Sequence, residues 1–479
     1  MTEKRSEATA VRRWVASIIF IAAVALTPGR AAAEKVLADI DGWQIYTDGR
    51  TGGFVSYAYG DGYPQANVEV DVNGNVNQIS APGLDGGFRS VTQQQQIAPG
   101  QNTQGTINMV RFRSGMVSNV FGFGVRTKLT EWTTLSAYVQ LWAFVENDGR
   151  QKNLPNFVDA RQGYARLEGR WGYFQAGRMR ALFSRGATDI DVLYAHRYGV
   201  GFPGTIDNRG PTLGQIGFGV LGNGFTSGFL YGTPSFGGLQ LDLGAFDAVV
   251  LPGMGNWIRT KYPLAQAEMT FTRTFGGGWG KVVLFGNGAY QKVYKDGACT
   301  SFTDMETGNT VPCDETVAGV GYGGRLELGP VHIGAAGHTG RGLGLNYALE
   351  TSDVAQDKQG NLRRITGWYV QSQFVIGKVD LFAGWGLVQV FNTDYDNLHT
   401  IADPRDPNAR IYPFNGLKRR MGINAGIVYN VTSNLHLDLD FFRAEADFYN
   451  TPDKTSAGVQ FPDMKQVVWV GNGGMTVNW

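Results

Sequence analysis

The stretch VVWVGNGGMTVNW, Val467–Trp479, closes the sequence with strict alternation. Side chains two residues apart point to the same face of a β-strand. One face of this stretch therefore carries the larger apolar residues, and the small or polar residues fall on the other. The apolar set is Val467, Trp469, Gly471, Gly473, Met475, Val477 and Trp479. The pattern predicts a strand with an apolar face that must be covered, and Trp479 belongs to that face.

Other stretches repeat this period. NLHLDLDF (434–441) places leucines and a phenylalanine opposite His436, Asp438 and Asp440, and AQAEMTF (265–271) places Glu268 on its polar side. Alternation is typical of any half-buried strand, including those of a soluble β-sandwich. The period therefore predicts an all-β chain but leaves its architecture open.

The lengths of the connections favour a membrane barrel. Short turns such as Trp171-Gly172, Gly329-Pro330 and Gly377-Lys378 alternate with long polar stretches, which is typical of outer-membrane β-barrels. We predict sixteen antiparallel strands near 43–59, 106–129, 134–147, 159–170, 172–179, 214–232, 237–250, 262–275, 278–294, 318–328, 331–341, 365–376, 379–392, 419–431, 434–449 and 466–479. Strands in lipid must close into a ring because an open edge leaves backbone groups unpaired. The last strand should therefore pair with the first, and we expect the chain to stop at Trp479 because a tail would hang at the rim.

The first residues resemble an export signal. Arg12 and Arg13 precede an apolar run, Trp14–Leu26, and the small residues Ala31–Ala33 follow it. This order predicts a secretory signal peptide over 1–33 and a barrel domain over 34–479. The apolar run is too short for a membrane helix. The paired arginines leave twin-arginine export as an alternative to the ordinary route.

Composition narrows the class of protein. Lys and Arg number 42 and Asp and Glu 41, so no global charge indicates a nucleic-acid partner. Glycine, at 68 residues, and aromatics, at 12%, suit short strands and tight turns. Cys299 and Cys313 form a close pair in an exported chain, which predicts a disulfide. A metal site is the weaker interpretation because no histidine lies near them.

Motifs for catalysis are lacking in the sequence. Gly319-x-Gly321-x-x-Gly324 and Gly217-x-Gly219-x-x-Gly222 match a dinucleotide pattern, but neither opens a helix after a buried strand. His332 and His338 should share a polar barrel face, as lining or, less simply, as metal ligands. We therefore expect no enzyme activity, no cofactor and no bound metal.

Several stretches resemble the Gram-negative general porin family of trimeric diffusion channels. RQGYARLEGRWGYFQAGR (161–178) is similar to the family's Arg-Gln-x-Tyr-x-x-Leu, turn and Gly-Arg segment. YGTPSFGGLQ (231–240) is similar to its Tyr-x-x-Pro-x-Phe-Gly-Gly turn, and SNVFGFGVRTKL (118–129) to its second strand. Asn119 departs from the family, which usually has arginine there. The resemblance implies a homotrimer and an inward-folded loop 3, and it makes Trp479 the signal that the outer-membrane assembly machinery reads.

Loop 3 would lie within Met179–Gln215. Its carboxylates Asp189, Asp191 and Asp207 could face basic residues on the wall and set ion selectivity; alternatively, the segment is a solvated surface loop. Arg161 carries over from the family motif, and strand parity or position adds further wall arginines, some of which could instead sit at the rims. The predicted basic wall residues are Arg111, Arg113, Arg126, Arg161, Arg178, Arg325 and Arg420. The predicted acidic wall residues are Glu268, Asp438 and Asp440.

One stretch points away from a plain diffusion pore. In LSAYVQLWAFVE (135–146) the parity places Tyr138, Gln140 and Trp142 inward, where aromatic rings could stack on sugars. With the opposite parity these rings would belong to the outer aromatic girdle.

The resulting hypothesis is a porin in the outer membrane of a Gram-negative bacterium. It would be surrounded by outer-membrane lipid and pass ions and small hydrophilic solutes by passive diffusion. A substrate-selective channel on the same barrel, for example for carbohydrates, is the alternative. An outer-membrane adhesin or hydrolase is a weaker one.

Overall fold

The computed structural model describes most of the chain after residue 33. The described residues are 34–62, 106–113, 119–143, 158–192, 214–248, 262–295, 313–349, 355–357, 360–394, 396, 417–449 and 465–479, with short strands at 68–70, 76–78, 257–258, 302–303, 310–311, 401–403 and 406–411.

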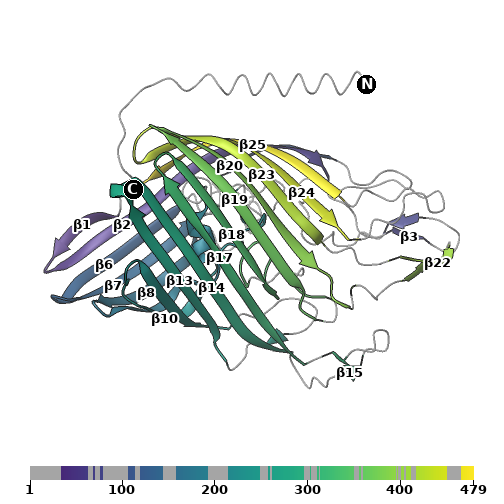
Figure 1. Ribbon diagram of the computed structural model, residues 1–479, viewed down its shortest axis with the longest axis horizontal. Coiled ribbons are helices and arrows are strands. Elements are labelled where there is room, and N and C mark those ends of the chain that lie inside the picture. Colours follow the sequence, from purple (N-terminus) through teal and green to yellow (C-terminus); the bar gives the residue numbers. More distant parts are fainter. Residues whose placement is uncertain are drawn as a thin grey trace.

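Sixteen antiparallel strands close into a barrel, as the alternation and the connection lengths predict (Figure 1). Two segments, β5 and β6, pair with successive parts of the same edge of β2 and count as one strand of the ring. In ring order the strands are β2 (Trp43–Asp61), β5 (Thr106–Arg113) with β6 (Val120–Thr130), β7 (Thr133–Ala143), β8 (Val158–Gly169), β9 (Gly172–Arg180), β10 (Phe225–Gly232), β11 (Leu239–Phe246), β13 (Leu264–Phe275), β14 (Gly280–Lys295), β17 (Asp314–Leu328), β18 (Val331–Arg341), β19 (Arg364–Ile376), β20 (Val379–Phe391), β23 (Leu417–Asn430), β24 (Leu435–Phe448) and β25 (Lys465–Asn478).

The predicted pairing of the last strand with the first closes the ring. β25 pairs with β2 from Arg50↔Asn478 to Gly60↔Val468. Beyond it, Gly49 and Trp479 exchange two backbone hydrogen bonds of 3.0 Å. A strand that the sequence analysis did not predict, β1 (Lys35–Ile40), pairs with Trp43–Thr47 of β2. The end of β25 and β1 thus occupy successive stretches of the same β2 edge.

The turn between β1 and β2 explains this extra strand. Asp41 and Gly42 both have positive φ, 52° and 81°. Two successive residues with positive φ are typical of a type I′ hairpin turn, for which Asp-Gly is a preferred sequence. The dipeptide was therefore an available signal that the sequence analysis missed.

The two faces of the wall differ as the period of two requires. On β25 the outward Trp469 and Met475 are 40% and 53% exposed, whereas the inward Val468, Val470 and Thr476 are fully buried. The large outward side chains form an apolar surface around the ring. This burial assigns each strand position to the outer or the inner face.

The connections at the two ends of the barrel differ in length. We call the end with turns such as Glu131-Trp132 and Gly377-Lys378 the short-turn end, and the other the long-connection end. Described residues of the long connections add three small hairpins and β12 (Trp257–Ile258), which pairs with β14. The hairpins join β3 (Val68–Val70) to β4 (Val76–Gln78), β15 (Phe302–Thr303) to β16 (Thr310–Val311), and β21 (Ile401–Asp403) to β22 (Asp406–Ile411).

Helical structure is short in the described residues. It includes α3 (Arg185–Ile190), in the connection after β9, and η2, a 3-10 turn at Gly276–Gly278. No helix in the described part of the chain is long and apolar enough to cross a membrane.

One predicted strand begins later than expected. Residues 214–224 were predicted to form the start of a strand, but β10 begins at Phe225. Gly217 and Gly219 have φ of 79° and 109°, and the amides of Phe218 and Val220 both donate to the carbonyl of Gln215. Positive φ at these glycines bends the chain out of the extended conformation.

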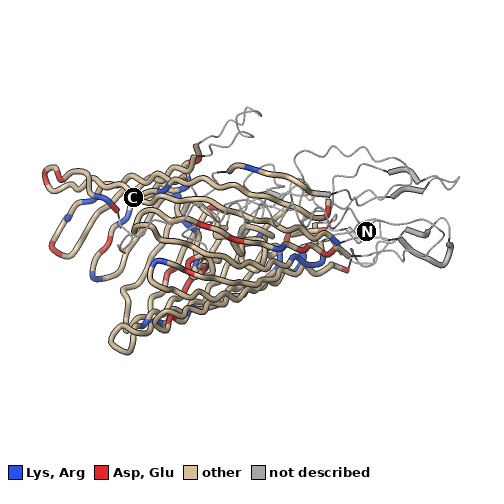
Figure 2. Tube along the Cα trace, turned by 90° about the horizontal axis from the view of Figure 1, so that it is seen from above, with Lys and Arg blue, Asp and Glu red and all other residues tan. Residues whose placement is uncertain are grey.

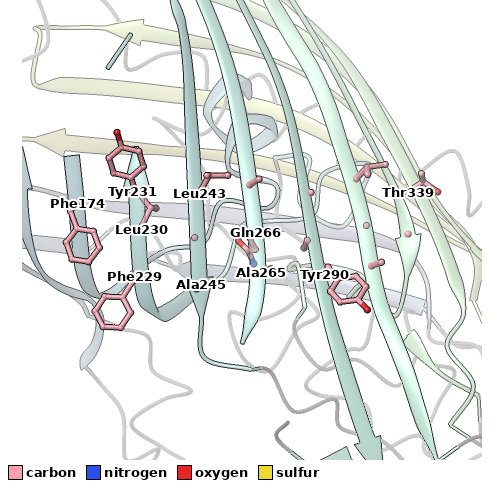
Figure 3. Close-up of a pocket in the computed structure, with 18 residues that line it drawn as sticks. Phe174, Phe229, Leu230, Tyr231, Leu243, Ala245, Ala265, Gln266, Tyr290 and Thr339 are labelled. Carbon is pink, nitrogen blue, oxygen red and sulfur yellow. The ribbon is translucent and has the colours of Figure 1, made fainter. Parts of the chain in front are cut away.

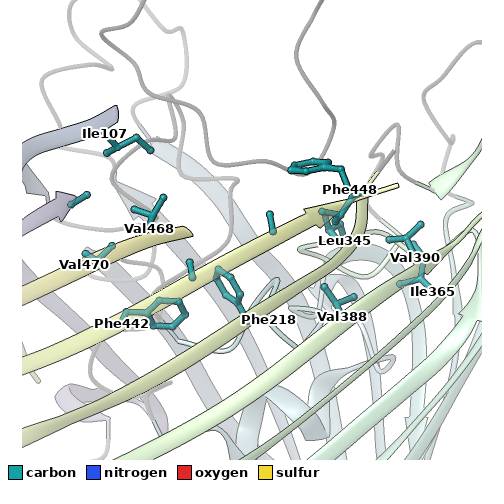
Figure 4. Packing of buried hydrophobic residues seen from close by; sticks show 14 of the residues in the cluster. Ile107, Phe218, Leu345, Ile365, Val388, Val390, Phe442, Phe448, Val468 and Val470 are labelled. Atoms are coloured by element: carbon teal, nitrogen blue, oxygen red, sulfur yellow. The ribbon is translucent and has the colours of Figure 1, made fainter. Parts of the chain in front are cut away.

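The inner face also carries an apolar cluster, on β2, β5, β19, β20, β23, β24 and β25 (Figure 4). Phe218 from the segment before β10 packs on Phe442 with ring centroids 4.8 Å apart. Val468 and Val470 of β25 belong to the same cluster. Part of the inner wall is therefore apolar and covered, and this favours a lumen narrower than the ring.

Candidate functional site

The inner face carries charged and amide side chains along several strands. In β24 His436, Asp438 and Asp440 face inward, and Asp438 and Asp440 are 5% and 4% exposed. On the neighbouring β23, Arg420 and Asn424 face inward. Figure 2 shows that basic and acidic residues are intermingled along the chain rather than segregated. The wall thus offers charges of both signs.

The segment that follows β9 is fastened to the wall by Arg185, the first residue of α3. Arg185 Nε donates to Glu268 Oε1 on β13 over 2.7 Å, and its Nη2 is ion-paired with Asp242 on β11. The backbone N–H of Gly186 donates to the other oxygen of Glu268 over 2.9 Å. Both carboxylates are buried.

These carboxylates keep Arg185 charged. Burial on its own lowers the pKa of Arg185, but Glu268 and then Asp242 raise that pKa above its ordinary value. A buried ion pair holds its geometry when additional hydrogen bonds satisfy the remaining donors and acceptors. The Gly186 amide supplies such a bond to Glu268.

The far side of the same segment contacts β19. Tyr369 donates its hydroxyl hydrogen to the Ala187 carbonyl over 2.7 Å. The Val192 amide donates to Gln371 Oε1 over 3.0 Å, and Gln371 Nε2 donates to Asp191 Oδ1 over 2.8 Å. The segment therefore contacts inward side chains from β11 to β19.

Two of the three predicted loop-3 carboxylates lie within the described residues. Asp189 pairs with Arg180, at the end of β9, over 2.6 Å. Asp191 is 3% exposed and accepts from the amide of Gln371. Asp207 lies outside the described residues. At Arg185 the predicted polarity is reversed, because the connection supplies the cation and the wall supplies the carboxylates.

Two connections meet inside the barrel. The Gly222 amide donates to the Asn346 carbonyl, and the Ala348 amide donates to the Gly222 carbonyl, both over 2.8 Å. Arg420 Nη1 donates to Asn346 Oδ1 over 2.8 Å and to the Gly217 carbonyl over 3.4 Å. Arg420, predicted as a wall residue, is 1% exposed and holds residues 214–224 and 342–349 together.

A glycine is required where this segment touches the wall. A Cβ at Gly219 would lie 2.3 Å from the Trp368 carbonyl oxygen of β19. The Gly217/Gly219/Gly222 pattern that resembles a dinucleotide motif thus serves a turn and a close backbone approach.

Most other predicted wall arginines have acidic neighbours. Arg126 faces inward, donates to Gln44 over 2.9 Å and is ion-paired with Glu34. Arg325 pairs with Glu327 over 3.1 Å. Arg111 lies half-buried at an inward position of β5, and only the backbone of Arg113 is described.

Arg161 reaches the inner face through a β-bulge. The register of β7 and β8 shifts between Gln140↔Gln162 and Leu141↔Ala160, leaving Arg161 as the extra residue. Its guanidinium carbon lies 4.8 Å from the ring centroid of Trp142, and Nε pairs with Asp159 over 2.7 Å. Because of the bulge, Gly163 and Ala165 do not share its face.

The prediction that Arg178 lines the pore is wrong. Arg178 pairs in register with Gly163 and Ser227, on the same face as Phe174 and Phe229. These rings are exposed on the outer surface. Strand parity therefore places Arg178 outside, although its position in the family-like segment suggested the wall.

Tyr138, Gln140 and Trp142 face inward and line a cavity of about 330 Å³. Tyr138 donates to Asp48 Oδ1 over 2.8 Å, and Trp142 Nε1 donates to Gln140 Oε1 over 2.8 Å. The other lining residues are Glu34, Tyr46, Arg50, Val120, Gln162, Tyr164, Arg180 and Phe225. The cavity thus combines aromatic faces with amide, hydroxyl, carboxylate and guanidinium groups.

The sequence analysis missed several residues of this cavity and the anchor Arg185. Tyr46 and Tyr164 flank Tyr138, with ring centroids 6.3 and 5.6 Å from it. Tyr46 and Tyr164 lie at inward parity, so alternation applied across β2 and β8 could have found them. Arg185 has no such signal, because it lies in an irregular connection.

The structure describes only part of what was predicted for the cysteines, Trp479 and the histidines. Cys313 is disulfide-bonded, and Cys299 lies outside the described residues. The Trp479 ring lies 5.4 Å from that of Phe121 on the outer face. His332 contacts Arg325 and Gln373, and no group of three or more metal-binding side chains occurs within the described residues.

Comparison with known proteins identifies solved structures that have a similar fold. No family model and no curated protein sequence match the chain. It is similar to the outer-membrane channel DcaP of Acinetobacter baumannii, with a TM-score of 0.53 and 12% identity over 94% of this chain and 100% of that one. It is also similar to an anion-selective porin from Comamonas acidovorans, with a TM-score of 0.52 and 13% identity over 91% and 100% of the two chains. The chain thus has a closed sixteen-stranded barrel similar to outer-membrane proteins of Gram-negative bacteria.

Proposed function

We propose that this protein is a porin of the outer membrane that passes ions and small hydrophilic solutes by passive diffusion, without catalysis. The observation that carries the proposal is the contrast between the two faces of a closed ring. The outer face is apolar. The inner face bears amide side chains and charged side chains of both signs. A ring of sixteen strands is wide enough to leave an aqueous channel.

The fastened connections support a narrowed channel. Arg185 attaches α3 to Glu268 and Asp242, and Arg420 joins the residues around Gly217 and Asn346. These contacts hold charged groups of the connection and the wall close together. Opposed fixed charges in a narrow passage orient polar solutes and set ion selectivity. We propose Asp189 and Asp191, together with Asp207, as contributors to the charge of the passage.

A selective channel is the second candidate. The cavity around Tyr138 and Trp142 offers stacking surfaces with hydrogen-bonding groups at their edges. Sugars present apolar ring faces and hydroxyl edges, so this combination suits a carbohydrate. Trp142→Ala should weaken the reduction of ion current by maltose if the cavity holds sugars, and unchanged current reduction would exclude that role.

The proposed location in the outer membrane also implies how the protein is exported and assembled. We propose a homotrimer in outer-membrane lipid, with residues 1–33 removed on export and Trp479 read by the assembly machinery. In this orientation the short-turn end faces the periplasm, and the long-connection end faces the outside.

Liposome swelling tests the diffusion channel. Vesicles containing the purified protein should swell at rates that fall steadily as the external sugar grows from a pentose to a trisaccharide. Vesicles with protein heated until the barrel unfolds provide the control. Equal, slow swelling with and without folded protein would contradict the proposal.

A further inference from the structure

The outer surface of the barrel is hollowed by an apolar groove. It crosses the wall from β9 to β18 with a volume of about 940 Å³ (Figure 3). Small residues, Ala245, Ala265, Gly288 and Ala318, alternate along it with Phe229 and Tyr290. The exposed side chains of Phe229 and Tyr290 show that this is the outward face.

The groove follows one row of residues paired across the strands. Phe229 pairs with Ala245, Ala245 with Ala265 and Ala265 with Tyr290. Tyr290 then pairs with Ala318, Ala318 with Arg341 and Arg341 with Arg364. The apolar row therefore leads directly to two neighbouring arginines.

The row rises towards the long-connection end. Phe229 lies in the middle of β10, which runs from Phe225 at the long-connection end to Gly232 at the short-turn end. Arg341, in contrast, is the last residue of β18, and Arg364 is the first of β19. Arg341 and Arg364 thus lie at the end of the groove that is nearer the long-connection end of the barrel. The aromatic ring of Phe229 lies at the opposite end of the groove.

The two arginines need a counter-charge. Like charges opposite one another on antiparallel strands destabilise the pair. Both side chains are exposed, and neither is ion-paired with a carboxylate among the described residues. Arg364 lies over the ring of Phe391, 4.1 Å from its centroid, which orients the guanidinium. Nearby Lys292 already has a partner in Asp314, 3.1 Å away.

We propose that this groove binds a phosphate-bearing lipid of the outer leaflet. The phosphate accepts hydrogen bonds from Arg341 and Arg364, and an acyl chain lies over Ala318, Ala265 and Ala245. Guanidinium groups bind phosphate with charge-assisted hydrogen bonds, and the small residues leave room for a chain that the surrounding lipid supplies. The inference rests on the proposed placement in the outer membrane with the long connections outside.

Native mass spectrometry of the full-length protein in detergent tests the site. Dioleoyl phosphatidic acid is the probe, and dioleoyl phosphatidylcholine is the comparison lipid without net charge. Removing each arginine as Arg341→Gln or Arg364→Gln should lower retention of phosphatidic acid roughly fivefold. Gly288→Leu, which fills the groove floor, should lower retention of both lipids.

Matched variants control for general effects. Arg273→Gln removes an exposed outward cation at the short-turn end of β13, and Gly286→Leu adds the same side chain one outward position below Gly288. Both should retain lipid like the unaltered protein. Equal retention in all variants would overturn the proposal. Displacement of phosphatidic acid by equimolar inorganic phosphate would also overturn it. The same holds if two barrels associate through the groove and Gly288→Leu abolishes that association.

The proposed channel and the proposed lipid site can be refuted independently of each other. Lost lipid retention with normal bilayer conductance would refute this site and leave the proposed channel intact. Selective lipid retention by a barrel that does not conduct would refute the channel instead.

Discussion

Arg185 in α3 and Glu268 in β13 form an ion pair of 2.7 Å that joins the connection after β9 to the barrel wall. The second oxygen of Glu268 accepts from the Gly186 amide and from Asn287 Nδ2, the latter over 3.1 Å. Both oxygens are therefore occupied, and the pair is a fixed attachment rather than a loose surface contact.

Breaking this attachment should release the connection. Arg185→Leu leaves Glu268 and Asp242 without their cation, and removal of one partner of a buried pair costs roughly 3–5 kcal/mol. Single channels should then close more often and show a broader range of conductance. Arg178→Leu, on the outer face, should leave the records unchanged. Identical records for Arg185→Leu and the unaltered protein would show that the attachment does not shape the pore.

Arg420 should hold the two inward connections together. Arg420→Met removes the bonds to Asn346 and Gly217, so the amides of Gly222 and Ala348 should exchange hydrogen roughly tenfold faster. Mass-spectrometric hydrogen exchange measures this change. Arg419→Met, whose side chain faces outward, is the control. Unchanged protection of both amides would contradict the role given to Arg420.

The period of two and the lengths of the connections predicted the closed barrel because lipid imposes the same requirement on every strand. Each wall position must face either lipid or the interior, so alternation indicates side-chain direction without knowledge of neighbours. The pairing of β25 with β2 follows from closure. Arg126, Arg420, Tyr138 and Trp142 accordingly lie on the inner face, where parity places them.

Site residues were less predictable where the backbone departs from that period. The bulge at Arg161 changes the parity of the residues beyond it, and a family-like motif placed Arg178 on the wrong face. The partner of Arg185 depends on how an irregular connection packs against strands distant in sequence. No local pattern encodes that contact.

Cys299 and Cys313 should be dispensable for barrel assembly. Replacing both with serine removes a cross-link within a long connection, whose loop-closure contribution of about 3 kcal/mol acts locally. The heat-modified gel mobility of the barrel should therefore match that of the unaltered protein. Loss of the folded, heat-modifiable band would show that the disulfide supports the wall itself.

Trp479 should act in delivery more than in stability. Trp479→Ala should sharply lower the amount of protein in outer membranes, while protein refolded in detergent keeps its melting temperature within a few degrees. Trp469→Ala, an outward tryptophan on the same strand, controls for loss of an aromatic at the lipid surface. Equal outer-membrane abundance for the two variants would leave Trp479 a packing residue.

Single-channel recording in planar lipid bilayers tests the central claim most directly. Purified full-length protein, confirmed as folded by its heat-modifiable mobility, is added at low concentration to one side of the bilayer. The water-filled channel predicts discrete steps whose conductance rises in proportion to the salt concentration. Folded protein that inserts into the bilayer and gives no conductance steps would contradict the channel.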